Sequence, residues 1–213
     1  MRPGPTIISE CYKCHGLFKQ WTLSSGNTFT AQFWPDGLMK APMMPEMPPL
    51  FHCPSCEEFI WRRDCKEIDE VHGYDEMKEK YPEVQSYKDP TIDTFILALE
   101  EKGLTKGREG YIRTKLMHFF NDENRDSEIP ISQPSDMQIE NYKRLLIIAN
   151  KNDANDTMLR AEIYREMGEY DKSLELLEKV KDKDFATNVL VLKELCKNKD
   201  SRVMEILRRE DNF

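Results

Sequence analysis

Two pairs of cysteines are the residues whose type and spacing point most directly to chemistry. Cys11 and Cys14 form one Cys-x-x-Cys pair, Cys53 and Cys56 form the second, and residues 15–52 separate them. Each pair offers two sulfur ligands from one tight turn, and two such turns complete the tetrahedral shell of four thiolates that zinc takes in structural sites. A closed shell leaves no coordination position for a substrate. We therefore predict a structural Zn²⁺ ion here, with no catalytic residues and no site for another cofactor.

Two alternative kinds of site use part of the same pattern. His15 extends the first pair to Cys-x-x-Cys-His, the motif of covalent haem attachment, and residues 53–56 read Cys-Pro-x-Cys, as in dithiol oxidoreductases. Haem attachment of this type belongs outside the cytoplasm, and residues 1–8 contain two prolines and no secretory signal. A redox motif begins a helix in an α/β fold, whereas residues 59–61 predict a strand. A haem or thiol redox protein is therefore favoured less than a zinc protein.

The elements that must position the four cysteines are strands, turns and one proline-rich loop. Alternating apolar residues predict a half-buried strand over residues 28–34, and residues 35–37, Pro-Asp-Gly, predict a turn directly after it. Residues 42–49 contain four prolines and three methionines, which predicts an extended loop that either covers a small core or contacts a partner. Residues 1–5 are expected to be disordered.

The two pairs resemble the zinc-ribbon class, in which each pair lies on the turn of a β-hairpin. This resemblance implies that residues 1–66 form a small β module. Gly16 supplies the glycine that often follows a pair in this class, whereas Glu57 and Glu58 follow the second pair. Because such a module is too small to fold by apolar burial alone, metal binding would provide its folding free energy.

The remaining cysteines and histidines form no second constellation. Cys65 follows the last strand of the ribbon closely enough to be an alternative thiolate, and Cys196 is so distant that we expect no disulfide and a reducing compartment. His52 is expected on the surface or near a metal-bound sulfur, and His72 and His118 lack partners at catalytic spacing. The sequence contains no phosphate-binding glycine loop, nucleophile elbow or metallohydrolase motif, so it supports no class of enzyme.

Charge and hydropathy limit the partners of this chain. Its 213 residues carry a net charge of −8, of which residues 1–66 contribute +1 and residues 67–213 contribute −9. An acidic body repels phosphate, so binding to nucleic acid would depend on the ribbon alone. No stretch approaches the roughly 20 apolar residues of a membrane span. We expect a cytoplasmic protein without membrane contact.

Beyond the ribbon, the pattern changes from strands to helices. Residues 67–89 are acidic and interrupted by Gly73 and Pro82, which predicts a linker with a short helix near residues 75–81. Asp89 as N-cap and Pro90 at the first helical position then predict the start of a helix, whose apolar stripe spans residues 92–99 and which ends at Gly103. Apolar residues with a 3.6-residue period predict further helices over residues 109–121, 135–150, 156–167, 170–180, 185–197 and 201–209. The predicted fold class is α+β, with a zinc ribbon at 1–66, a linker at 67–89 and an all-α domain of helical hairpins at 90–213.

Residues 156–181 resemble one tetratricopeptide repeat, a pair of closely packed antiparallel helices. The pattern of the family places small residues where the two helices cross, a glycine at the turn between them and large residues around the crossing. The residues that carry the resemblance are Ala161, Tyr164, Gly168, Tyr170, Ser173, Leu177 and Val180. One repeat cannot bury its own faces, so the flanking helices must stack on it. The resemblance implies a concave surface that binds a protein or peptide, built by about three helical hairpins and a closing helix.

These observations favour a non-catalytic interaction protein, an adaptor or scaffold that binds a protein or peptide partner. The alternative is a zinc-ribbon protein associated with nucleic acid, because the ribbon carries aromatic residues that can stack on bases: Trp21, Phe29, Phe33, Trp34 and Trp61. Its basic residues are too sparse to form a basic face: Lys13, Lys19, Lys40, Arg62, Arg63 and Lys66. The sequence does not determine the oligomeric state.

Overall fold

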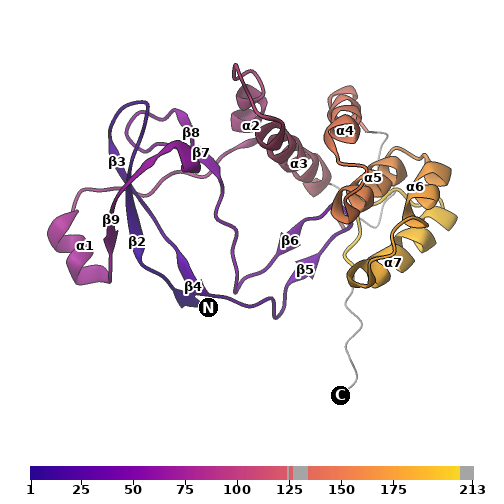
Figure 1. Cartoon of the computed structure of the whole chain (residues 1–213), viewed down its shortest axis with the longest axis horizontal. Coiled ribbons are helices and arrows are strands. Elements are labelled where there is room, and N and C mark those ends of the chain that lie inside the picture. Colours follow the sequence, from indigo (N-terminus) through magenta and orange to yellow (C-terminus); the bar gives the residue numbers. More distant parts are fainter. Residues whose placement is uncertain (124, 127–133, 207–213) are drawn as a thin grey trace. The chain divides into compact units, whose positions relative to one another are not determined.

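The computed structural model describes residues 1–123, 125–126 and 134–206. The chain divides into two compact units, whose elements are labelled in Figure 1. Unit 1 consists of Met1–Ala31 and Ala41–Ala98, and unit 2 consists of Gln32–Lys40 and Leu99–Phe213. Small antiparallel sheets occupy the N-terminal part of the chain and helices the C-terminal part, as the predicted mixture of strands and helices requires.

A three-stranded antiparallel sheet forms the frame of unit 1. Its strands are β2 (Thr6–Glu10), β3 (Leu17–Gln20) and β9 (Lys66–Val71), in the order β3-β2-β9. A second hairpin pairs β7 (Leu50–His52) with β8 (Phe59–Trp61). Each hairpin turn carries one cysteine pair, and the strand predicted over residues 59–61 is present as β8.

The apolar core of unit 1 lies against the cysteines. Phe18, Phe51 and Ile60 are completely buried together with Cys11 and Cys53. The rings of Phe18 and Phe51 meet edge to face with 5.4 Å between their centroids. Aromatic burial on both hairpins therefore holds the two turns close to each other.

Residues 67–89, for which the sequence predicted a linker, are folded into unit 1. Strand β9 fills the free edge of β2, and α1 (Tyr74–Lys80) follows it. Beyond α1, the backbone of Lys88 exchanges two hydrogen bonds with His52, at 2.9 and 3.1 Å. Helix α2 (Ile92–Ala98), shorter at both ends than the helix predicted from Pro90 to Gly103, also belongs to this unit. Edge pairing is a long-range interaction that the acidic composition of this stretch does not reveal.

Two short segments of the N-terminal half differ from the prediction. Residues 1–5, expected to be disordered, include β1 (Arg2–Pro3), which pairs with β4 (Leu23–Ser25). The strand predicted over residues 28–34 is wrong for most of its length. Phe29 is 77% exposed and Thr30 has a left-handed backbone (φ 59°), because residues 28–31 form a turn. Alternation over so few residues does not distinguish a strand from a turn.

The described residues of unit 2 contain five helices that the apolar period predicted. They are α3 (Lys106–Asp122), α4 (Asp136–Ile148), α5 (Ala154–Glu166), α6 (Tyr170–Leu177) and α7 (Ala186–Lys197), and consecutive helices pack against each other. Side chains cap the first three: Thr105, Ser135 and Asp153 each accept a hydrogen bond from a backbone N–H of the first turn. The short 3₁₀ turns η1 (Arg62–Asp64) and η2 (Lys183–Phe185) complete the helical elements.

The closing helix predicted over residues 201–209 is not formed by residues 201–206, and residues 207–209 lie outside the described residues. The segment is instead extended: the Ile206 N–H donates to the Phe33 carbonyl at 2.7 Å, and the Val203 carbonyl accepts from Asp126 N–H at 3.1 Å. Val203 and Ile206 are buried. The apolar residues that predicted a helix here are therefore buried although the segment is not helical.

Helices α5 and α6 form a tight hairpin. Gly168 adopts φ 76° in the connection, and the N–H groups of Gly168 and Glu169 donate to the last carbonyls of α5 at 2.9 and 2.8 Å. Ala161 and Ser173 are completely buried where the two helices meet. Small residues at the crossing and a glycine at the turn thus allow close approach, as the sequence predicted.

A β-hairpin from between the two cysteine pairs belongs to unit 2. Strands β5 (Gln32–Phe33) and β6 (Met39–Lys40) pair around the predicted turn at residues 35–37, which Gly37 permits by its φ of 82°. The Trp34 N–H donates to the Leu38 carbonyl at 3.0 Å and closes this turn. The prediction assigned these residues to the ribbon.

Candidate functional site

The first cysteine pair lies on a turn that directs backbone N–H groups at sulfur. The Cys11 N–H donates to the Gly16 carbonyl at 3.0 Å, and the His15 N–H donates to the Cys11 carbonyl at 2.9 Å. The N–H groups of Lys13 and Gly16 donate to the sulfurs of Cys11 and Cys14, both at 3.4 Å. Such bonds favour the negatively charged thiolate that binds metal.

The second pair repeats this geometry. The Cys53 N–H donates to the Glu58 carbonyl at 2.9 Å, the Glu57 N–H to the Cys53 carbonyl at 3.0 Å, and the Ser55 N–H to the Cys53 sulfur at 3.4 Å. The left-handed residue of this turn is Glu57, with φ 61°, and the equivalent residue of the first turn is His15, also at 61°. Neither is a glycine, so the missing glycine after Cys56 does not prevent the turn.

The four predicted ligands form one cluster. All four sulfur atoms, those of Cys11, Cys14, Cys53 and Cys56, lie within 4.8 Å of one another, and the sulfurs of Cys14 and Cys53 are 3.7 Å apart. A disulfide requires about 2.05 Å, and all six cysteines are free. Four sulfurs at about 2.3 Å from a tetrahedral zinc ion are separated by roughly 3.8 Å. The cluster therefore fits a metal ion of this size.

Gly16 has a specific role in bringing the two turns together. A Cβ atom at this position would lie 2.6 Å from the Ser55 hydroxyl and 3.3 Å from the Cys14 sulfur. Any side chain would therefore push the two turns apart. The glycine is required by close approach and not by a left-handed backbone.

The protonation chemistry of the thiols also suits a bound cation. Burial raises the pKa of Cys56 to about 12 and raises that of Cys11. Burial opposes ionisation of Cys53 as well, but backbone hydrogen bonds of Cys56 and Ser55 outweigh it, and the Cys53 pKa is lowered. Four thiolates so close together repel each other. A dication at their centre removes this repulsion, and coordination deprotonates the thiols.

Two neighbouring residues considered from the sequence are not members of the cluster. The Cys65 thiol donates to the Trp61 carbonyl at 3.4 Å, and burial raises its pKa to about 11. Both ring nitrogens of His52 are engaged, with the Glu57 carbonyl at 2.7 Å and the Thr94 hydroxyl at 2.6 Å. His52 therefore stabilises the second cysteine turn through its hydrogen bond to Glu57, and neither ring nitrogen is directed at a sulfur.

No protein-family model, curated protein or solved structure matches this chain. The arrangement of its own residues therefore carries the functional argument. No helix among the described residues is long and apolar enough to cross a membrane.

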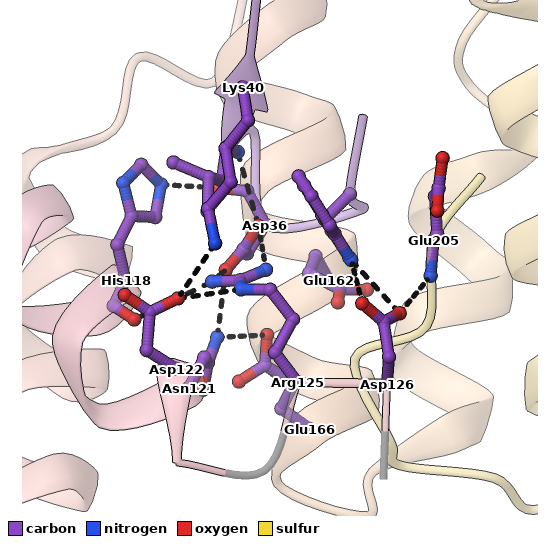
Figure 2. A network of polar contacts seen from close by, with 12 residues as sticks. Asp36, Lys40, His118, Asn121, Asp122, Arg125, Asp126, Glu162, Glu166 and Glu205 are labelled. Carbon is purple, nitrogen blue, oxygen red and sulfur yellow. Dashed lines mark hydrogen bonds and ion pairs between the residues drawn. The ribbon is translucent and has the colours of Figure 1, made fainter. Parts of the chain in front are cut away.

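Unit 2 contains a buried polar network that sequence reasoning missed (Figure 2). At its centre is the Asp36 carboxylate, at the tip of the β5–β6 hairpin. It accepts hydrogen bonds from Arg125 at 2.8 and 3.3 Å and from Asn121 at 3.1 Å. The His118 ring donates to the Asp36 carbonyl at 3.1 Å. Although burial opposes ionisation, the hydrogen bond from Arg125 prevails and lowers the pKa of Asp36.

The network continues into α4 and α5. Asn121 donates to Glu166 at 3.2 Å, and the Tyr142 hydroxyl is hydrogen-bonded to both Glu166 and Asn121. Burial, with repulsion from Glu162, raises the pKa of Glu166 well above its usual range. Burial therefore favours the protonated form of the Glu166 side chain. The signal in the sequence that could have revealed Glu166 is a polar residue at a buried position of the α5 helix period.

The indole of Trp34 makes a second set of contacts at the hairpin tip. Its N–H donates to the Asp126 carboxylate at 3.1 Å, and the Arg125 guanidinium lies 5.0 Å from the ring centroid. Asp126 also accepts from the Glu205 N–H at 2.8 Å, and so it joins the hairpin to the extended segment after α7. These contacts fix the hairpin on the helices of unit 2.

A hollow runs along the face that the hairpin tip shares with α3, α5 and α7. One cavity of about 220 Å³ is lined by Trp34 and Pro35 together with Thr114, Leu159 and Asn188 among others. A second cavity, of about 330 Å³, extends from it toward Lys106 at the start of α3. The two share Thr114, Asp156 and Leu159, so they form one groove, hereafter the unit 2 groove.

Proposed function

We propose that this chain is a non-catalytic interaction protein, in which the four-cysteine cluster holds a structural zinc ion and the unit 2 groove binds a segment of a partner protein. The observation that carries the proposal is the groove itself, which residues of α3, α5 and α7 line together. Leu145 and Ile148 of α4 also line its larger cavity. Repeat proteins bind peptides on a concave surface built by several packed helices, and residues 156–181 resemble such a repeat.

The lining of the groove suggests the chemistry of its partner. Trp34, Leu159, Phe185 and Leu192 provide apolar walls for the smaller cavity. Asn188 offers a side-chain amide that can both donate to and accept from a peptide backbone. The expected partner is therefore a segment with one large apolar side chain, which a cavity of about 220 Å³ can accommodate.

A structural role for zinc is supported by the composition of the cluster. Four cysteines complete a tetrahedral shell, and a catalytic zinc ion keeps one position for water or substrate. In this role the thiolates of the two turns would hold the metal, and the metal would supply folding free energy to unit 1. No chemical step is assigned to it.

The nucleic-acid alternative has less support. Three of the six basic residues on which it depends take part in internal contacts: Lys13 pairs with Glu58 at 3.3 Å, Lys40 lies 5.1 Å from the Trp34 ring centroid, and Arg62 is hydrogen-bonded to Gln20. Phosphate binding would require these cations to leave their present contacts.

Site-specific photo-crosslinking in the native cell tests the interaction proposal. A photoreactive residue at Asn188, inside the groove, is expected to capture a distinct partner, whereas one at Leu190, 65% exposed on the same helix, is not. A synthetic peptide from the captured region should then bind the purified chain, and Asn188→Trp should abolish this binding while Leu190→Trp preserves it. The proposal is contradicted if the partner is captured equally at both positions, or if Asn188→Trp does not change the affinity for the peptide.

A further inference from the structure

We propose that the hairpin formed by residues 32–40 is a movable wall of the unit 2 groove, and that its docking depends on metal in the four-cysteine cluster. The metal would then regulate partner binding, so this inference rests on the function proposed above. Three properties of the hairpin support it: its place in the groove, its dependence on contacts outside itself, and its position in the chain.

The hairpin tip forms one side of the groove. Residues 34–37 line the smaller cavity together with Phe185 and Leu192 of the helical part. If the hairpin left the helices, the cavity would lose this wall and its aromatic Trp34 surface. Partner binding therefore requires the docked hairpin.

The hairpin is too small to keep its shape alone. Its ladder contains two pairs, Gln32 with Lys40 and Phe33 with Met39. An isolated two-stranded hairpin is at best marginally stable in water. The contacts of Trp34 and Asp36 with α3 and the residues after it therefore hold the hairpin in place (Figure 2).

The chain path links these contacts to the cysteine cluster. The hairpin lies within residues 15–52, whose ends are the two cysteine pairs. The two arms that lead to it are in contact inside unit 1, because a Cβ atom on Gly26 would lie 2.6 Å from the Met43 carbonyl oxygen. Metal coordination closes this loop and keeps its arms together. Without metal the arms can separate, and the entropy cost of docking the hairpin increases.

Hydrogen exchange of the full-length protein, followed by mass spectrometry, measures this dependence. We compare the zinc-loaded protein with protein treated with a zinc chelator, without any partner. The expected result is exchange about tenfold faster or more for residues 32–40 and the end of α3 after chelation, with a clearly smaller increase in α6 and α7. Zinc, but not magnesium, should restore the slow exchange. Unchanged exchange of residues 32–40, or an equal loss of protection in α6 and α7, would overturn the inference.

Two variants provide controls in the same experiment. Cys65→Ser, outside the cluster, should show the same zinc dependence as the unsubstituted chain. Asp36→Ala should release residues 32–40 even with saturating zinc, because it removes the bonds to Arg125 and Asn121. Slow exchange of residues 32–40 in Asp36→Ala contradicts the assigned docking contacts. The exchange experiment tests only the dependence of the hairpin on zinc, and the crosslinking experiment tests only partner binding by the groove. Either result can therefore be negative while the other is positive.

Discussion

At the scale of single residues, the interior of unit 2 contains a paired charge and a buried acid with a raised pKa. Glu162 and Arg165 are completely buried, contact each other through two hydrogen bonds at 2.5 and 2.8 Å, and Arg165 also donates to the Asp200 carbonyl at 2.6 Å. Burying a charge is costly unless it is paired. Removing one partner leaves the other charge buried and uncompensated, and this lowers the free energy of unfolding by more than the intact pair contributes to it. The free energy of unfolding should depend on pH where the pKa of an acid in unit 2 is shifted, as it is for Glu109 and Glu166.

Glu109 should make the protein sensitive to acid. Hydrogen bonds from Arg144, which outweigh burial, and from Arg113 lower its pKa to about 2. Because this folded-state pKa is below the ordinary value of 4.5, the stabilisation is complete above pH 4.5 and is lost as the pH falls toward 2. Glu109→Gln should lower the free energy of unfolding by about 1–2 kcal/mol at pH 7, a figure discounted for the half-exposed Arg144.

Urea unfolding at pH 7 and pH 2 measures this effect. At pH 2 the difference between Glu109→Gln and the unsubstituted chain should largely disappear. Glu175→Gln is the matched control, because its partner Lys179 is exposed and the pair contributes little. An equal loss of stability at both pH values would show that packing, not charge, is responsible.

Glu166 should have the opposite dependence on pH. Its pKa is raised, so the folded protein retains a proton that the unfolded chain loses above pH 4.5, and its contribution to stability falls as pH rises. Glu166→Gln keeps the hydrogen bonds to Asn121 and Tyr142 without the ionisation. This variant should be more stable than the unsubstituted chain at pH 8 and less dependent on pH between 5 and 8.

Denaturant titrations across this pH range compare it with a second variant. Glu166→Leu leaves Asn121 and Tyr142 without their partner and should reduce the unfolding free energy by about 1–3 kcal/mol. A Glu166→Gln protein with an unaltered pH dependence would mean that Glu166 is ionised in the folded state.

At the scale of elements, the β5–β6 hairpin is the least expected part of the fold. It lies between two cysteine-bearing turns in sequence and yet its contacts are with α3 and the residues after α7. Trp34 and Asp36 are 4% and 1% exposed. The hairpin therefore contributes buried surface to unit 2 as a helix would.

Trp34→Ala should destabilise unit 2. It removes a buried ring and leaves the Asp126 carboxylate without the indole donor, with an expected cost of about 3–5 kcal/mol. Trp21→Ala, at a position 37% exposed in unit 1, should cost less than about 1 kcal/mol. Denaturation monitored by helical circular dichroism tests both, because α3–α7 belong to unit 2. Similar costs for the two substitutions would exclude a role of the hairpin in that unit.

At the scale of the whole molecule, the two units are not successive pieces of chain. The backbone passes from unit 1 to unit 2 after Ala31, returns after Lys40 and leaves again after Ala98. A fragment that begins at residue 90, the predicted domain boundary, would lack the hairpin and expose Asn121 and Arg125. Expression of the helices alone should therefore give a less stable protein than the full chain.

Metal binding should depend on four cysteines and not on the other two. We expect the purified chain to contain one zinc ion, Cys53→Ser to lose it, and Cys65→Ser to keep it. Elemental analysis gives the metal content, and a shift in the thermal unfolding of unit 1 should accompany its loss. Zinc retained by Cys53→Ser, or lost equally from Cys65→Ser, would contradict the assigned ligand set.

The sequence by itself determined the features that depend on local spacing. The Cys-x-x-Cys pairs, the apolar period of α3–α7, the Gly168 turn and the Pro35 turn each involve residues within a few positions of one another. Their physical cause is the geometry of one turn or one helix face. The composition also identified an acidic helical part after the cysteines.

Only the tertiary structure decided which distant residues meet. Asp36 contacts Asn121 and Arg125 across 85 and 89 residues, and β9 pairs with β2 across most of unit 1. Local propensity carries no information on such pairings, because they arise from the burial and hydrogen bonding that the complete fold allows. The cysteines could be recognised as a set without the fold; the groove and its hairpin wall could not.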